Sequence, residues 1–228
     1  MFVTGYTACF SDECLEMTKA FLDWHDWQTF VQSDLSQINY PNLADQKQWF
    51  FELGMQQFKP AAVLVLIENL KIPQVILTVR SSRLQKHAGQ VSFAGGKKDE
   101  EDASLIATAL RETEEELGVA SQQITVYGQL PPLPTISAYE VHPVIGVLNE
   151  AVKMSINPDE VETVFRIPLA DLMRPENYRP YPIERHQKLF YTVQFPHQHI
   201  VWGVTATILL ALAQAYENWQ MKKSSLDV

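Results

Sequence analysis

"GGKKDEEDASLIATALRETEEELGV", residues 95–119, is the stretch that decides the fold. After a Gly-Gly turn, its pattern predicts an amphipathic helix from about Asp102 to Leu117. We expect Asp102 to cap the start of the helix and Gly118 to end it in a left-handed conformation. One narrow sector of this helix is suited to pack on a sheet, and it holds Ile106, Leu110, Thr113 and Leu117.

A second sector of the same helix is acidic. Glu112, Glu115 and Glu116 are related as i, i+3 and i+4, and Arg111 lies four residues before Glu115, where it can hold that carboxylate. Repulsion costs a few tenths of a kcal/mol per pair on an exposed helix, so a solvated acidic face is the ordinary interpretation. Magnesium, however, takes several carboxylate oxygens together with phosphate oxygens and water. The sector therefore also indicates a divalent cation site.

This stretch resembles the Nudix box, G-x5-E-x7-R-E-U-x-E-E-x-G-U, where U is apolar. The positions in register are Gly96, Asp102, Arg111-Glu112, Glu115-Glu116 and Gly118-Val119. Asp102 replaces the usual Glu, one extra residue precedes Arg111, and Thr113 stands at an apolar position. The resemblance implies an α/β Nudix fold, a mixed β-sheet sandwiched between helices (α/β/α). It also implies Mg²⁺ or Mn²⁺, held by the Gly96 carbonyl, Glu112, Glu115 and Glu116, with Arg111 orienting Glu115. Asp99 and Asp102 could be outer-sphere ligands, as the alternative to capping the helix.

The preceding stretch, "ILTVRSSRLQKHAGQVSFAGG" (residues 76–96), is similar to the signature of the coenzyme A pyrophosphatase branch of that family. Seven positions stand in register: Thr78, Arg80, Ser81, Gly89, Phe93, Gly95 and Gly96. Gln85 replaces an arginine of the signature and Ala94 a proline, which leaves one fixed cation fewer and a less constrained turn. The resemblance implies hydrolysis of the diphosphate bond of coenzyme A or its derivatives to 3′,5′-ADP and 4′-phosphopantetheine.

In that chemistry water is the nucleophile, and bound cations polarise the diphosphate. Glu112, Glu115 and Arg111 are the expected catalytic residues of the helix. Nudix enzymes draw the general base from this helix or from a later loop, and Glu160 in "NPDEV" is the loop candidate. A helix-start acid that helps the helix dipole is the ordinary alternative for Glu160.

A basic cluster precedes the Gly-Gly turn, and we expect it to bind the substrate phosphates. It consists of Arg80, Arg83, Lys86 and His87. Arg80 is favoured by its motif position, and each of the others could equally be a solvated surface charge.

Two rival functions stay open. One is a Nudix hydrolase of another nucleoside diphosphate derivative, such as ADP-ribose, a dinucleotide or an oxidised nucleotide. The other is a catalytically inactive Nudix-fold binding module.

The rest of the chain predicts two regions: an N-terminal helical extension, residues 1–58, and a Nudix hydrolase domain, residues 59–228. The extension has helical spacing in 43–58 and could cover the sheet, mediate a homodimer or close over the site. In the domain, strands are expected in 61–68 and 74–80 as a hairpin, near 90–95, 123–130 and 138–150, and in 164–169. A last strand pair is expected at 188–195 and 199–202, before a C-terminal helix.

Composition limits the partners. The 228 residues carry a net charge of −9, with a pI near 5.1. That charge disfavours nucleic acid as a partner. The Nudix resemblance implies a small-molecule nucleoside diphosphate derivative as the partner. Two cysteines, Cys9 and Cys14, are too few for a disulfide framework. With no recognisable signal peptide and no apolar run long enough for a membrane, we expect a cytoplasmic protein.

Overall fold

The structure is a computed structural model that describes residues 22–41, 43–185 and 188–226. Cys9, Cys14 and the first 21 residues of the expected N-terminal extension lie outside the described residues.

A mixed eight-stranded sheet forms the centre of the molecule. Its strands run in the order β3-β2-β1-β7-β5, with β4 and β6 pairing with β1 and β7, and β8 with β2. The parallel pair is β1 with β7, and the remaining pairs are antiparallel. The strands are β1 (Lys59–Glu68), β2 (Gln74–Arg80), β3 (Val91–Ser92), β4 (Ala94–Lys97), β5 (Thr125–Gln129), β6 (Leu133–Pro134), β7 (Tyr139–Leu148) and β8 (Val161–Pro168).

The expected hairpin of β1 and β2 is confirmed, but it is paired only beside its turn, where Ile67 faces Val75. Farther along, β4 pairs with β1 from Ala61 to Leu64, so that Gly96 lies opposite Ala62. The Gly-Gly sequence is therefore part of a strand inside the sheet, rather than a turn in front of the helix.

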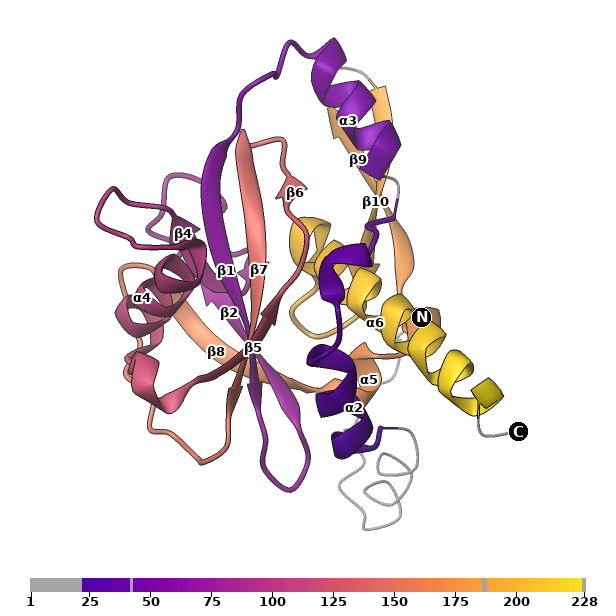
Figure 1. Cartoon of the computed structure of the whole chain (residues 1–228). Coiled ribbons are helices and arrows are strands. Elements are labelled where there is room, and N and C mark those ends of the chain that lie inside the picture. The colour runs from indigo at the N-terminus through magenta and orange to yellow at the C-terminus, as the bar shows by residue number, and fades with distance from the viewer. Residues whose placement is uncertain (1–21, 42, 186–187, 227–228) are drawn as a thin grey trace, which may run out of the picture.

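Helices cover both faces of this sheet, which confirms the α/β/α arrangement (Figure 1). One face packs against α4 (Leu105–Leu117), which contacts β1 and β4. The other face carries α2 (Trp24–Val31), α5 (Leu169–Leu172) and α6 (Gly203–Leu226). The described residues also form short 3₁₀ helices at η1 (Leu35–Gln37), η2 (Ser121–Gln123) and η3 (Pro175–Asn177).

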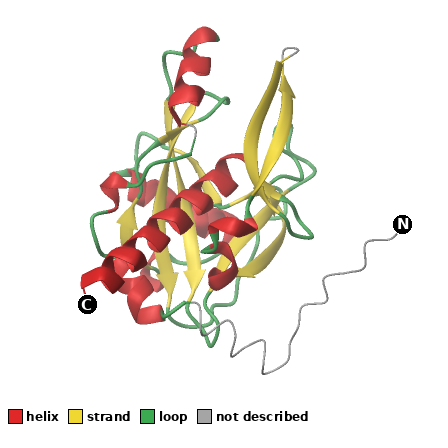
Figure 2. Ribbon diagram, turned by 90° about the vertical axis from the view of Figure 1, so that its right-hand side faces the viewer, coloured by secondary structure: helices red, strands yellow, loops and turns green. Residues whose placement is uncertain are grey.

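A second, three-stranded sheet joins β9 (Arg179–Arg185), β10 (Lys188–Phe195) and β11 (Val201–Trp202) in the order β11-β10-β9. The expected pairing of the last two strands is confirmed. The sequence did not predict β9, which carries Pro180 and Pro182, because prolines are tolerated on such edge strands but argue against a strand. Figure 2 shows the β9–β10 hairpin projecting from the body, and α3 (Leu43–Glu52) meets it where Trp49 lies 4.1 Å from Phe190 between ring centroids.

The N-terminal segment is built into the main core. Trp27 and Phe30 of α2 are buried, and each ring lies 5.3 Å from the ring of Tyr216 in α6. Residues 22–40 thus share one hydrophobic cluster with the sheet and α6. The division at residue 59 stays a prediction.

Candidate active site

Helix α4 begins and ends at well-defined caps. The hydroxyl of Ser104 accepts a hydrogen bond from the Ala107 amide at 3.1 Å, so Ser104 is the N-cap, and the prediction of Asp102 in that role is wrong. Gly118 ends the helix with φ 67°, which confirms the predicted left-handed C-terminus. The first helical residue is Leu105, so Asp102 lies before the helix and does not cap it.

The face that α4 turns to the sheet agrees in part with the predicted stripe, because Thr113 and Leu117 are buried there. Ile106 and Leu110 are only half-buried. The side chains that are buried are Thr108, Ala109, Thr113, Glu116 and Leu117. The acidic sector is divided between the buried and the exposed side of the helix. Glu116 is 2% exposed, whereas the side chain of Glu115 is 52% exposed.

Arg111 binds carboxylates on both sides. Its Nε lies 2.9 Å from Asp102, and its two terminal nitrogens lie 3.0 Å from Glu112 and from Glu115. The predicted contact with Glu115 is confirmed. Asp102 also accepts hydrogen bonds from the Asp99 amide and the Thr108 hydroxyl. The hydrogen bonds from Arg111 hold the pKa of the Asp102 carboxyl well below its usual range, so this pair stays charged.

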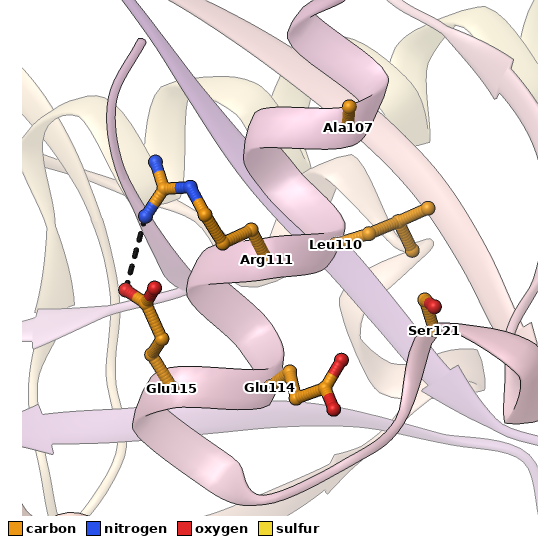
Figure 3. A pocket seen from close by; sticks show the side chains of 6 residues that line it. All are labelled: Ala107, Leu110, Arg111, Glu114, Glu115 and Ser121. Atoms are coloured by element: carbon orange, nitrogen blue, oxygen red, sulfur yellow. Dashed lines mark hydrogen bonds and ion pairs between the residues drawn. The ribbon is translucent and has the colours of Figure 1, made fainter. Parts of the chain in front are cut away.

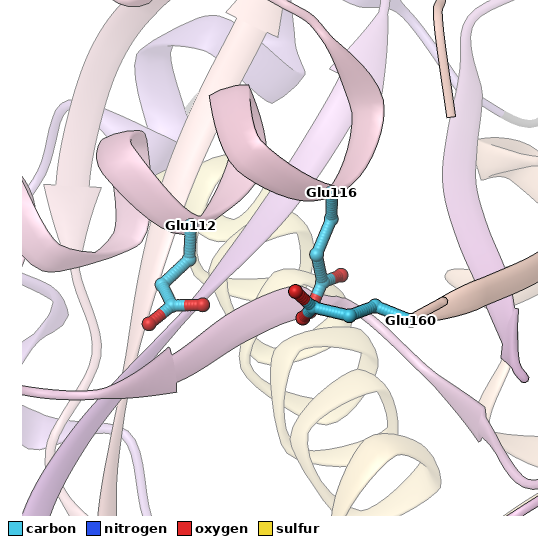
Figure 4. A group of neighbouring side chains, drawn as sticks. All are labelled: Glu112, Glu116 and Glu160. Atoms are coloured by element: carbon cyan, nitrogen blue, oxygen red, sulfur yellow. The ribbon is translucent and has the colours of Figure 1, made fainter. Parts of the chain in front are cut away.

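Three carboxylates converge below α4. Glu112 and Glu116 extend from the helix, and Glu160 reaches toward Glu116 from a separate segment at the right of the view (Figure 4). One oxygen from each lies within 4.8 Å of the others, and among the described residues this is the one such group of acidic, histidine or cysteine side chains. Glu115 is not part of the group, and its carboxylate is bound by Arg111.

Backbone hydrogen bonds bring Glu160 to the helix. The segment before β8 docks on the end of α4, where the amides of Ser155 and Asn157 donate to the carbonyls of Leu117 and Glu116. Asn157 then donates to a Glu160 carboxylate oxygen at 3.2 Å. On its other side, the Glu160 carbonyl accepts from the Ser81 amide at 2.8 Å. A loop residue is thereby fixed between α4 and the end of β2.

Two glycines let the sheet approach these carboxylates. A Cβ at Gly96 would lie 2.4 Å from a Glu112 carboxylate oxygen, so the carboxylate occupies the space of the missing side chain. The backbone of Gly95 helps to lower the pKa of Glu116 against the effect of burial. Gly96, predicted as a backbone ligand, thus lies directly against the Glu112 carboxylate.

The electrostatics of the group favour a bound cation. Burial raises the pKa of Glu116 to about 8, and the nearby charges of Glu160 and Glu112 add to the rise, while Arg80 and the Gly95 amide oppose it. Burial also raises the pKa of Glu112, against the influence of Arg111. Crowded, partly desolvated carboxylates of this kind are stabilised in the ionised form by a divalent cation with oxygen preference. The donor set therefore fits Mg²⁺ or a similar hard cation.

The four residues of the predicted basic cluster lie in different surroundings. Arg80 is close enough to Glu116 to lower its pKa, and its Nε is buried without a hydrogen-bond partner among the described residues. Arg83 pairs with Asp159 at 2.8 Å in an exposed position. Lys86 is exposed, and His87 hydrogen-bonds to other protein side chains. Of the four, Arg80 is the one that the structure brings to the carboxylates.

A shallow hollow of about 350 Å³ lies on another side of α4 (Figure 3). It is lined by Ala107, Leu110, Arg111, Glu114, Glu115 and Ser121. The three converging carboxylates are not among these residues, so the hollow is distinct from the carboxylate group.

Asp102 is the functional residue that the sequence misjudged. Its partner Arg111 was identified, but a carboxylate that anchors it from outside the helix was not. The available signal was the box itself, because Asp102 stands at the acidic position that precedes the arginine in the Nudix pattern.

Comparison with known proteins agrees with this geometry. The family model described as NUDIX domain matches residues 58–188. The chain belongs to the Nudix family. An uncharacterized Nudix hydrolase NudL from Photorhabdus laumondii is 43% identical over 158 residues, covering 68% of this chain and 83% of that relative. Another from Pectobacterium atrosepticum is 41% identical over 160 residues, covering 70% and 83%.

Solved structures of Nudix proteins also match. The NUDIX domain of Shewanella oneidensis NrtR complexed with ADP ribose is 21% identical, with a TM-score of 0.41 over 56% of this chain and 86% of that one. A C. elegans Ap4A hydrolase in a binary complex is 21% identical, with a TM-score of 0.41 over 50% and 83%. This Nudix chain is a hydrolase of the class that cleaves diphosphate bonds in nucleoside diphosphate derivatives. None of its described helices has the length and apolar character needed to cross a membrane.

Proposed function

We propose that this Nudix hydrolase cleaves the diphosphate bond of coenzyme A or a derivative, giving 3′,5′-ADP and 4′-phosphopantetheine, with Mg²⁺ or Mn²⁺. The observation that carries the proposal is the meeting of Glu112, Glu116 and Glu160 within 4.8 Å, near the half-buried side chain of Arg80. Carboxylates suited to a divalent cation, next to an arginine whose Nε has no hydrogen-bond partner among the described residues, suit a substrate whose diphosphate bridges the cation and the arginine. The choice of coenzyme A is supported by the signature-like stretch of residues 76–96.

In the proposed site, Glu112, Glu116 and the Gly96 carbonyl hold the cation. Bound there, a divalent cation supplies positive charge that neutralises the diphosphate and stabilises the charge developing during hydrolysis. Glu115 is proposed as a further ligand. Its carboxylate lies 3.0 Å from Arg111, so it must leave that ion pair to bind the cation.

Glu160 is proposed as the general base. It comes from a segment outside α4, and its carboxylate accepts a hydrogen bond from the side-chain amide of Asn157 at 3.2 Å. In this role Glu160 takes a proton from the attacking water. Arg80 is proposed to bind a substrate phosphate, because its buried Nε then gains the acceptor that it lacks. The same role is proposed for Arg83 and Lys86 at the exposed end of the loop, whereas the ring nitrogens of His87 contact Gln90 and Ser137.

Product analysis tests the proposal. The purified protein is incubated with coenzyme A, dephospho-coenzyme A and ADP-ribose, each with Mg²⁺ or Mn²⁺, and the products are separated by chromatography. We expect 3′,5′-ADP and 4′-phosphopantetheine from coenzyme A. Glu116→Gln is expected to lose at least about a hundredfold in kcat/KM. Glu114→Gln is the matched control, because Glu114 is an exposed glutamate of the same helix and is expected to leave activity unchanged.

The outcomes separate the rival functions. Turnover of ADP-ribose without turnover of coenzyme A retains the cation site and rejects the substrate. A folded protein that hydrolyses no diphosphate supports a binding module. Glu115→Gln distinguishes a ligand from a residue that only partners Arg111: the proposed ligand role predicts a higher Mg²⁺ requirement, with kcat restored at saturating metal.

A further inference from the structure

The loop from residue 81 to 89 leaves β2 beside the proposed site and returns directly to β3. Its base is closed by two hydrogen bonds of 2.9 Å, from the Arg80 amide to Gln90 and from the Gly89 amide to Arg80. Ser81 ties the same base to the active-site segment, because its amide donates to Glu160 and its hydroxyl to Pro158. The base is thus fixed to the carboxylates, while the outer part carries exposed basic side chains.

The outer part of this loop contacts a second loop. His87 Nε2 lies 3.3 Å from the hydroxyl of Ser137, in the turn between β6 and β7. His87 Nδ1 lies 2.9 Å from Oε1 of Gln90. A carboxamide oxygen only accepts, so in neutral His87 the Nδ1 proton is donated to Gln90 and Nε2 accepts from Ser137.

Both loops hold a residue in an unfavourable backbone conformation at this contact. His87 has φ 58° and Ala138, the neighbour of Ser137, has φ 61°, and among the described residues these are the non-glycine positions with positive φ. The left-handed region costs about 1–2 kcal/mol for a residue with a Cβ. Such conformations persist where the surroundings impose them, and they concentrate at functional sites.

The turn that presents Ser137 is firmly held. The amide of Thr135 donates to Tyr139 at 2.8 Å, and the amide of Ala138 donates back to Thr135 at 3.0 Å. The carbonyl of Ala138 in turn accepts from the Lys59 amide at the start of β1, at 2.9 Å. Ser137 is therefore a fixed point on the central sheet, to which the outer part of the other loop is attached.

We infer that His87 is a positioning residue, which clasps the outer part of the loop of residues 81–89 to the turn of residues 135–138 and thereby sets where Lys86 meets the substrate. This rests on the proposed function for its consequence in catalysis, and it assigns His87 an indirect role in place of phosphate binding. Both ring nitrogens are engaged by protein atoms, so a substrate phosphate would have to displace one of them. The loop next to the proposed phosphate site is held from two ends, Glu160 and Ser137.

Three variants and their combination test the clasp. Ser137→Ala removes the partner of His87, His87→Ala removes the imidazole, and His87→Asn keeps a residue that tolerates positive φ but shortens the side chain. We expect each to raise KM for coenzyme A about two- to tenfold, the value of one ordinary hydrogen bond, with kcat within about twofold of the parent. The double variant with alanine at both positions is expected to be no worse than the more affected single variant. Ser82→Ala, an exposed serine of the same loop, is the matched control.

Amide hydrogen exchange gives a readout that needs no substrate. Loss of the clasp is expected to speed exchange of residues 82–89 in Ser137→Ala and in both His87 variants, while α4 stays protected. Unchanged exchange in all three variants overturns the inference. Additive KM effects of Ser137→Ala and His87→Ala also overturn it, because they mean that His87 contacts the substrate directly. Failure of the parent protein to hydrolyse coenzyme A rejects the proposed function, and the exchange measurement still decides the clasp.

Discussion

Gly96 is the residue at which backbone and carboxylate use the same space. A Cβ there would lie 2.4 Å from Glu112, whose carboxylate is the far end of a flexible side chain and can move away. A Cβ on the neighbouring Gly95 would instead lie 2.4 Å from the carbonyl oxygen of Ala62, in the backbone of β1. One glycine therefore serves the carboxylate group and the other serves the sheet.

Gly96→Ala is expected to keep the fold and to lose about ten- to a hundredfold in kcat/KM, because Glu112 is displaced from the proposed cation. Gly95→Ala is the contrasting variant and is expected to lower the free energy of unfolding, since backbone must shift. Thermal unfolding and steady-state kinetics of both variants check the pair. Full activity in Gly96→Ala would contradict the role given to this position.

Glu116 makes stability depend on pH in the metal-free protein. Its pKa is raised from an ordinary 4.5 to about 8, mainly by burial. Between those values the unfolded chain has released a proton that the folded protein still binds, so rising pH lowers the free energy of unfolding. We expect Glu116→Gln to raise the thermal unfolding midpoint by a few degrees at pH 8 in EDTA. Near pH 4.5 we expect no difference between the variant and the parent protein.

Differential scanning fluorimetry across pH checks this expectation. Glu114→Gln is the control, because that exposed side chain on the same helix should give no pH-dependent difference. Addition of Mg²⁺ is expected to stabilise the parent protein more at pH 8 than at pH 6, since cation binding requires the ionised carboxylates. A Glu116→Gln midpoint below that of the parent at pH 8 without metal would show that the carboxylate is not destabilising.

At the scale of elements, α4 shows which features local sequence determines. Its existence, its glycine stop and the contact of Arg111 with Glu115 follow from spacing along one helix, and the structure has all three. The depth of burial follows only in part: Thr113 and Leu117 are buried as expected, whereas Ile106 and Leu110 are half-buried at the edge of the cluster. The local pattern of α4 does not predict which of its small side chains will contact a neighbouring strand such as β4. The insertion of β4 beside β1, which brings Gly96 under Glu112, depends on long-range pairing.

The start of α4 separates a cap from an anchor. Ser104→Ala is expected to lower the free energy of unfolding by about 1 kcal/mol and to leave kcat unchanged, because only a helix cap is lost. Asp102→Asn is expected to cost more stability and also activity, since it releases Arg111, which holds Glu112 and Glu115. Chemical denaturation and kinetics check both.

Asp99→Asn is the control for this pair, because Asp99 lies 3.7 Å from Arg111 and its side chain is 44% exposed. We expect little change from it. An Asp102→Asn variant with the stability and activity of Asp99→Asn would mean that Arg111 needs no anchor outside the helix.

At the scale of the whole molecule, the N-terminal segment shows what sequence reasoning could not provide. Its aromatic residues and helical spacing predicted helices, and α2 and α3 are present among the described residues. The local pattern of residues 22–40 does not indicate what they pack against. Their partner is α6, where Trp27 contacts Tyr216, a residue far away in the sequence. The sequence suggested that this segment is an extension of the domain. In the structure it belongs to the hydrophobic cluster on the face of the sheet that lies opposite α4.

Trp27→Ala tests whether this segment belongs to the domain. Trp27 is fully buried and contacts Phe30 and Tyr216, so its removal is expected to lower the free energy of unfolding by about 3–5 kcal/mol. Trp24→Ala is the matched control, since Trp24 lies on the same helix but is only partly buried and should cost clearly less. A single cooperative transition at a lower midpoint, measured by both tryptophan fluorescence and far-UV circular dichroism, is expected for Trp27→Ala. An early loss of local fluorescence, followed by an unchanged main transition, would instead establish residues 22–40 as a separable layer on an independently stable Nudix domain.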